Sequence, residues 1–262
     1  MSTKNRTKFT VEGTHPLLGL VRDHFISRGL ALVPLSDEPD FCLVGGVLEG
    51  EETHPPLAQL ELQKMLVDGK PVVLLSTNDF HISADSESRE DSHVGISPRW
   101  TSQRRARCLY ALAAEHIFMD REHATTIIVR PHNVYGPDIT WGLIHDSIVA
   151  ARKGEKLINP RNSWCCTSFL HQDDFLKAID ILLKSKANGI FNVASSEEVS
   201  YVNLLRNIWK FINGADEEPI IESKQIPIYL ENDLPRTVKL HRATGWAQKI
   251  SLRSGIFKMV QE

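Results

Sequence analysis

The chain has no apolar run long enough to span a bilayer and no long run of basic residues. A membrane-spanning helix needs about 20 consecutive apolar residues, and the first residues of the chain lack the apolar segment of a signal peptide. The formal net charge is only -3, which gives little attraction for nucleic acid or for an anionic membrane surface. These absences predict a cytoplasmic protein that binds neither nucleic acid nor membrane.

Cysteine is also scarce, with four in 262 residues and no Cys-x-x-Cys pair. A disulfide framework or a structural zinc site would need more cysteines, or the spacing typical of metal ligands. Two of the four, Cys165 and Cys166, are adjacent in the chain. We therefore expect four reduced thiols and no metal site.

What the chain does contain is an alternation of short β-branched runs with amphipathic segments, which indicates an α/β protein. The predicted strands are residues 8–11, 31–35, 41–44, 71–75, 125–129 and 189–193. The predicted helices include residues 56–67, 100–120, 141–153 and 202–211, with one more closed by Gly29 and another reaching Leu183. Residues 78–99 are polar and are expected to form an exposed loop.

The segment 127–138 is the most informative one. Its β-branched residues predict a buried parallel strand ending near Arg130, and proline and glycine break the chain directly afterwards. Ligands of open α/β sheets bind outside the carboxyl ends of the strands, so Asn133 and Tyr135 would lie at a binding rim. A plain loop between strand and helix would show the same pattern.

The first strand is followed by Gly13 and Gly19, in a loop of the kind that lets the backbone approach a pyrophosphate at a helix amino end. Pro16 stands where the middle glycine would be, adding a ring and removing an N–H donor. Proline is equally a favourable residue at the start of a helix. Ser36 occupies the position of an acidic ribose-binding residue, with Asp37 one step later.

One pair of polar residues follows a predicted strand, and another pair begins a predicted helix. Ser76 and Thr77 follow the strand 71–75, where hydroxyl groups could be catalytic or could cap a turn. Asp173 and Asp174 open the helix that reaches Leu183, which favours a role at the helix amino end over metal binding.

Several segments, in this order and spacing, resemble the extended short-chain dehydrogenase/reductase family, in its NAD-dependent epimerase/dehydratase group that acts on nucleotide-sugars. They are Arg130–Pro137, Phe169–Asp174, Gly189–Val193, Thr244–Trp246 and Ser251–Gly255. The resemblance extends from about Lys8 to the end of the chain, in a degenerate and shortened form, because the second strand runs almost directly into the third.

The resemblance implies a Rossmann-like, doubly wound, mostly parallel sheet with a small C-terminal substrate lobe. Residues 1–156 would form the dinucleotide-binding type of domain. Residues 157–262 would form mainly the lobe, with residues 169–195 returning to the sheet. The implied ligands are NAD or NADP and a nucleotide-sugar.

The family's catalysis depends on a Tyr-x-x-x-Lys dyad, in which tyrosine transfers a proton and lysine lowers its pKa. Alignment of the helix 100–120 places Arg107 and Ala111 at the two dyad positions, and Tyr110 is the only tyrosine of that helix. Thr77 matches the family's third catalytic position. Arg130 is assigned to the cofactor side.

On the substrate side, the resemblance assigns Asn133 to a substrate contact. Thr167 stands where the family usually has an arginine that clamps a diphosphate. Arg236 is matched to a second phosphate-binding arginine.

Three functions are compatible with this pattern. The first is a nucleotide-sugar enzyme with altered or lost redox activity, in which a histidine such as His81 or His116 serves as base with Thr77. The second is a pseudoenzyme that binds a nucleotide-sugar or a partner protein and uses no cofactor. The third is a lyase or hydrolase in the same cleft. The apolar residues of the segment 109–118 are compatible with a homodimer through the helices of residues 100–120 and 140–153, and burial against the sheet is the favoured alternative for them.

Overall fold

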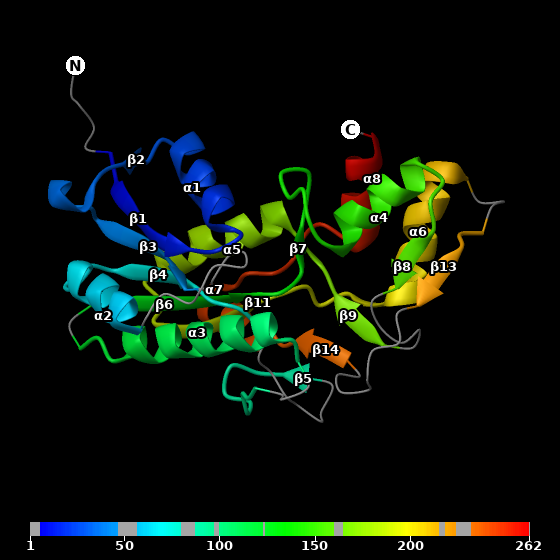
Figure 1. Ribbon diagram of the computed structural model, residues 1–262. Coiled ribbons are helices and arrows are strands. Elements are labelled where there is room, and N and C mark those ends of the chain that lie inside the picture. The colour runs from blue at the N-terminus through cyan, green and yellow to red at the C-terminus, as the bar shows by residue number, and fades with distance from the viewer. Residues whose placement is uncertain are drawn as a thin grey trace, which may run out of the picture.

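The computed structural model describes residues 6–46, 57–79, 87–96, 100–122, 124–159, 165–214, 218–223 and 232–261. Its centre is a six-stranded, all-parallel sheet with the strand order β11-β6-β4-β3-β1-β2 (Figure 1). The strands are β1 (Lys8–Thr14), β2 (Ala31–Leu32), β3 (Phe41–Gly46), β4 (Val72–Leu75), β6 (Thr126–Pro131) and β11 (Gly189–Val193). The predicted Rossmann-like α/β class is confirmed.

Both faces of this sheet are buried, as continuous β-branched and leucine runs predict. Along β3, Phe41 and Leu43 pack into one hydrophobic cluster while Cys42 and Val44 pack into another. The first cluster lies under two helices, α1 (Leu18–Ser27) and α5 (Gln172–Ser185). The second lies under α2 (Leu57–Leu66) and α3 (Ser102–Met119), on the opposite side of the sheet in Figure 1.

A smaller lobe has its own hydrophobic cluster. It contains α4 (Leu143–Arg152), α6 (Tyr201–Asn213), α8 (Leu252–Gln261), β8 (Leu157–Asn159) and β13 (Ile221–Ser223). Helix α4 packs against α6 in this lobe although it precedes residue 156, whereas β11 joins the main sheet beside β6. The predicted division at residue 156 stays a prediction.

Short strands connect the sheet to the lobe. They are β5 (Glu87–Ser88), β7 (Val134–Tyr135), β9 (Cys166–Ser168), β10 (Leu170–His171), β12 (Glu198–Ser200) and β14 (Asn232–Pro235). The last helix of the sheet region is α7 (Val238–Thr244), which packs against β11 and α5. None of the helices in the described ranges is long and apolar enough to cross a bilayer.

Three local predictions need correction. Strand β1 continues to Thr14, because its last residues pair with β3. Strand β2 ends at Leu32 rather than at residue 35, and a short 3-10 helix, Leu35–Asp37, follows it. The polar segment 78–99 contains the strand β5, because Ser88 pairs with Pro235 of β14.

The family-like segment at the carboxyl end of the chain has a structural role. The Asp174 carboxylate accepts hydrogen bonds from the backbone N–H of Lys249 and Ile250, at 3.1 and 2.8 Å, and the Trp246 indole N–H donates to the Asp174 carbonyl at 3.2 Å. Helix α5 is capped by the His171 side chain, which accepts from the backbone N–H of Asp173. Asp174 is therefore an anchor for the tail, in addition to favouring the helix dipole.

Substitution of Gly136 by alanine is expected to destabilise the protein, and the same substitution at Gly19 serves as the control. A Cβ at Gly136 would lie 2.4 Å from Cγ of Gln172, whose side chain is buried, whereas a Cβ at Gly19 would meet only a flexible arginine at 4.0 Å. Overpacking of this kind costs about 1–3 kcal/mol. Gly136→Ala should therefore lower the free energy of unfolding in urea by about that amount. Gly19→Ala, in helix α1, should leave it unchanged or raise it by up to about 1 kcal/mol; equal effects of the two variants would refute the packing argument.

Candidate functional site

The carboxyl ends of β1, β4 and β6 meet at one edge of the sheet, and His15 lies there directly after β1. Its side chain is 6% exposed. Nδ1 accepts a hydrogen bond from the backbone N–H of Leu17 at 3.0 Å, so the proton of the neutral ring is on Nε2, which donates to the Ser76 carbonyl at 2.9 Å. Burial lowers the pKa of His15 to about 4, with a smaller contribution from the charge of Arg107. The ring is therefore neutral at pH 7.

The His15 hydrogen bonds use the backbone donors at the amino end of α1. Pro16 has no N–H, Leu17 donates to the His15 ring, and Leu18 donates to the His15 carbonyl at 2.9 Å. In nucleotide-binding βαβ units, donors at this position face the pyrophosphate. In this chain the Leu17 and Leu18 donors are bonded to His15, whereas no such bond is made, within this described part of the chain, by the N–H groups of Gly19 and Leu20.

One of the two glycines of this loop is needed by the sheet. Gly13 has φ +74°, and a Cβ there would lie 2.4 Å from the Gly45 carbonyl oxygen. Gly13 is therefore required by the close approach of β1 to β3. Gly19 lies at the beginning of α1 with no close neighbour.

Ser36 and Asp37 are not brought to this edge. The Asp37 carbonyl accepts a hydrogen bond from the Lys8 ammonium at 3.2 Å, and the backbone N–H of Lys8 donates to Asp40 at 2.7 Å. Lys8 begins β1, whereas Gly13 lies five residues further along the strand. At about 3.3 Å per residue, Asp37 lies near the end of the sheet opposite Gly13.

Of the two residues aligned with the dyad, the structure places one beside this edge of the sheet and one in the core. Arg107 is partly buried and close enough to His15 for its charge to lower the histidine pKa. Ala111 is fully buried against Cys108. Tyr110 packs in the cluster between the sheet and α3, where burial raises its pKa.

Thr77 lies at the end of β4, where its hydroxyl oxygen accepts a hydrogen bond from the backbone N–H of Asp79 at 3.1 Å. Arg104 donates to the Asp79 carbonyl at 3.0 Å, which ties this turn to α3. The turn-capping role is thus observed, and the Thr77 hydroxyl proton remains available to a ligand. Of the two candidate histidines, His116 is exposed on α3 and His81 lies outside the described residues.

Arg130 is held by a buried carboxylate. Its Nε and Nη2 donate to the two oxygens of Glu115 at 2.9 and 2.7 Å, and Ser76 donates to the same carboxylate at 2.5 Å. Both side chains of this ion pair are 4% exposed or less. Arg130 therefore connects β6 to α3, and its bidentate geometry is already used.

Asn78, beside this network, has an unpaired oxygen. Its Nδ2 donates to the Arg130 carbonyl at 2.9 Å, whereas Oδ1 is buried with no hydrogen-bond partner. A buried polar atom without a partner costs free energy. Asn78 is therefore an additional candidate for ligand contact.

On the substrate side, the structure brings Asn133 and Thr167 together. Asn133 has φ +41°, and its Nδ2 donates to the Thr167 hydroxyl at 2.9 Å and to the Ser168 carbonyl at 3.1 Å. Thr167 is fully buried, whereas Asn133 is exposed. Arg236 lies apart from this pair. The register partner of Thr167 is Asp233, and Arg236 is three residues further along the same chain segment, which is about 10 Å.

Comparison with known proteins agrees with this fold. No protein-family model matches the chain. The human dTDP-D-glucose 4,6-dehydratase is 26% identical over 145 residues, which cover 52% of this chain and 40% of that protein. The chain thus matches less than half the length of this relative.

Two solved structures superimpose over nearly the whole chain. The Bordetella bronchiseptica enzyme WbmG, in complex with NAD, has a TM-score of 0.79 at 15% identity and covers 99% of this chain and 94% of its own. UDP-glucose 4-epimerase from Thermotoga maritima, with UDP-glucose, has a TM-score of 0.72 at 16% identity, with 97% of each chain covered. In fold, and over half its length in sequence, the chain is similar to the nucleotide-sugar epimerases and dehydratases of the extended short-chain dehydrogenase/reductase family, which confirms the resemblance seen in its motifs.

Proposed function

We propose that the chain binds a nucleotide-sugar at the carboxyl edge of its sheet and does not carry out nicotinamide-dependent hydride transfer. The main support is the loop at the amino end of α1. There the backbone N–H groups of Leu17 and Leu18 donate hydrogen bonds to the ring and the carbonyl of His15. A dinucleotide that used the Leu17 and Leu18 donors would have to displace both bonds, and it would find no donor at Pro16.

The other residues of a dinucleotide site do not fit NAD or NADP either. Asp37 lies near the opposite end of β1, so it does not reach an adenosine ribose at the glycine loop. Arg107 and Ala111 supply neither the phenol nor the amine of the dyad. We therefore derive no step through a nicotinamide, and we propose a pseudoenzyme or an enzyme without redox chemistry.

Support for nucleotide-sugar binding comes from Asn133. Its amide N–H group is bonded to β9, which fixes the side chain, and Oδ1 is left as an acceptor for a ligand donor. The Thermotoga maritima epimerase with UDP-glucose has the same fold. A sugar hydroxyl or a pyrimidine N–H is a donor of the required kind.

Asn133→Gly tests this proposal, since glycine accepts φ +41° without strain and removes only the side chain. We expect the Kd for UDP-glucose to rise about tenfold or more, equivalent to about 1.4 kcal/mol. The free energy of unfolding should fall by about 1 kcal/mol, from loss of the hydrogen bonds to β9. Titration calorimetry and urea denaturation measure the two quantities.

The matched control is Asn203→Gly, at an exposed position on α6, in the smaller lobe. It should lower the free energy of unfolding by less than about 0.5 kcal/mol, the difference between asparagine and glycine in a helix, without changing the Kd. An unchanged Kd for Asn133→Gly would assign this residue to loop structure alone. Absence of UDP-glucose and dTDP-glucose binding in the unmodified chain would contradict the nucleotide-sugar assignment itself.

Homodimerisation and cytoplasmic location stay predictions. Leu109 is 57% exposed on α3 and Val149 is 37% exposed on α4. These two helices lie in different parts of the molecule, α3 on the sheet and α4 in the lobe (Figure 1). An interface through both helices would have to cover both regions.

A further inference from the structure

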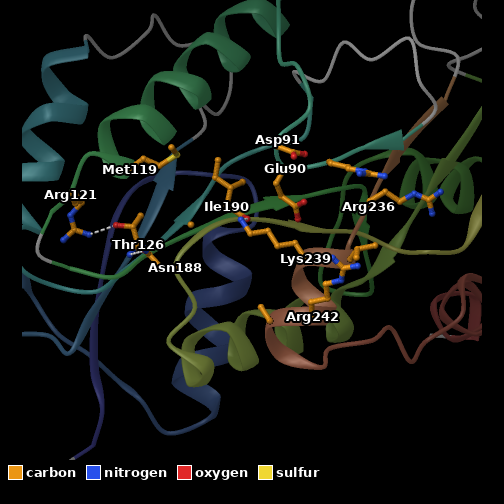
Figure 2. A pocket seen from close by; sticks show the side chains of 14 residues that line it. Glu90, Asp91, Met119, Arg121, Thr126, Asn188, Ile190, Arg236, Lys239 and Arg242 are labelled. Carbon is orange, nitrogen blue, oxygen red and sulfur yellow. Dashed lines mark hydrogen bonds between the residues drawn. The ribbon is translucent and has the colours of Figure 1, made fainter.

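A groove of about 1180 Å³ runs beside β11, at the free edge of the sheet and apart from the Asn133 and Thr167 pair. We call it the β11 groove and define it by Arg89, Met119, Arg236, Val238, Lys239 and Arg242. Figure 2 shows Arg236, Lys239 and Arg242 toward one end and Met119 and Arg121 toward the other. The groove therefore has a basic end and a mixed, partly apolar end.

The basic end collects like charges from the ends of β5 and β14 and from α7. Ser88 and Pro235 are register partners, so the residues that follow them, Arg89 and Arg236, lie side by side. Lys239 and Arg242 are three residues apart on α7 and share a helix face. All four side chains are exposed. Like charges at these spacings repel one another, and an anionic occupant would remove the repulsion.

Glu90 and Asp91 also line the groove, but its five basic residues outnumber them. The Glu90 carboxylate accepts a hydrogen bond from the backbone N–H of Asn192 at 3.0 Å, and Asp91 is exposed at the rim. Within the described ranges, neither Arg89 nor Arg242 forms an ion pair. Two guanidinium groups are therefore available to carboxylates from outside.

The edge strand itself is blocked against pairing with another strand. The Ile190 carbonyl accepts from the Lys239 ammonium at 2.6 Å, and the Asn192 N–H is bonded to Glu90. These are backbone groups that an added strand would need. An occupant of the groove must therefore be recognised through side chains.

The size and lining of the groove favour a peptide over a small ligand. Small-molecule sites usually measure about 300–1000 Å³ and enclose 70–90% of the ligand, whereas most of the residues that define the β11 groove are exposed. Met119 and Val238 are 50% and 51% exposed, which offers apolar area beside the cations. Methionine and arginine are enriched at protein interfaces.

We propose that the β11 groove is the docking surface for an acidic peptide segment of a partner protein. Carboxylates of the peptide contact Arg89, Arg236 and Arg242, and an apolar residue packs on Met119. This binding is independent of the Asn133 and Thr167 pair, because it uses neither residue.

A random decapeptide library displayed on phage, selected on the immobilised full chain, tests the proposal. Enriched peptides should combine aspartate or glutamate with a bulky apolar residue. The enriched peptides should bind Arg89→Gln/Arg242→Gln at least about tenfold more weakly, because charge-assisted contacts are lost. Met119→Ser should weaken only the peptides that carry the apolar residue.

The matched control is Arg22→Gln/Arg253→Gln, which removes the same charge from two exposed arginines outside the groove. It should leave peptide affinity within about twofold, apart from screened long-range effects. No enrichment over blank support, enrichment without acidic residues, or equal losses in the two double variants would overturn the proposal. Displacement of the peptides by micromolar pyrophosphate would reassign the groove to a small anion.

Discussion

Glu115→Ala is expected to lower the free energy of unfolding by about 3–5 kcal/mol, the range for breaking a buried ion pair from one side. Glu115 accepts two hydrogen bonds from Arg130 and one from Ser76, and both charged side chains are 4% exposed or less. The substitution leaves the Arg130 guanidinium buried without the carboxylate that balances its charge, although Nη1 still donates to the Glu90 carbonyl at 3.2 Å. Urea denaturation followed by far-UV circular dichroism measures the loss.

The control removes both charges together. Glu115→Leu/Arg130→Met replaces the pair by apolar side chains of similar size, and such replacements are often neutral or stabilising. We expect the double variant to recover most of the stability that Glu115→Ala loses. A loss of less than about 1 kcal/mol in the free energy of unfolding of Glu115→Ala is what an exposed ion pair would give. That result would contradict the burial of Glu115 and Arg130.

A pH dependence from His15 is the second large expected effect. The ring is buried and neutral, with its folded-state pKa lowered from 6.5 to about 4. Below pH 6.5 the unfolded chain therefore binds a proton that the folded chain does not. Stability is fully present above pH 6.5 and falls as the pH drops toward 4, by about 2 kcal/mol at pH 5 for this residue alone.

His15→Asn isolates that contribution, because asparagine does not titrate and its side-chain oxygen can still accept from the Leu17 N–H. The other titrating groups, including the His24 and Asp180 pair, are common to both proteins. The variant should lose about 2 kcal/mol less than the unmodified chain between pH 7 and pH 5. If the free energy of unfolding falls equally with pH in His15→Asn and in the unmodified chain, His15 is solvated or already charged in the folded protein.

Most strands of the sheet could be predicted because each is recognisable from its own residues. The β-branched run before Arg130 and the apolar run before Ser76 are each buried on both faces and are each ended by a break in the chain. By contrast, the predicted β2 is too long. Its length is set by the pairing with β1, which ends at Leu32, and by the turn that brings Asp37 back to Lys8, and neither is visible in the residues of β2 itself.

The site was less predictable because its contacts join residues far apart in the chain. One signal was present for the Glu115 and Arg130 pair: each is an isolated charge within an apolar segment, and opposite charges in buried segments usually pair. No local pattern indicated that His15 would fold back onto Leu17, because the histidine follows a glycine loop that otherwise resembles a phosphate site. The binding role of Asn133 stays a prediction, with its fixed amide as support.

We propose that this fold is retained while His15 and Pro16 obstruct the place of a dinucleotide pyrophosphate at the amino end of α1. Isothermal titration calorimetry of the purified full chain with NAD and with NADP, each to about 1 mM, tests it directly, since a Kd of 1 mM corresponds to only about 4 kcal/mol of binding free energy. We predict no saturable binding of either dinucleotide. Saturable one-to-one binding with a Kd below about 10 μM, near 7 kcal/mol, would contradict the account.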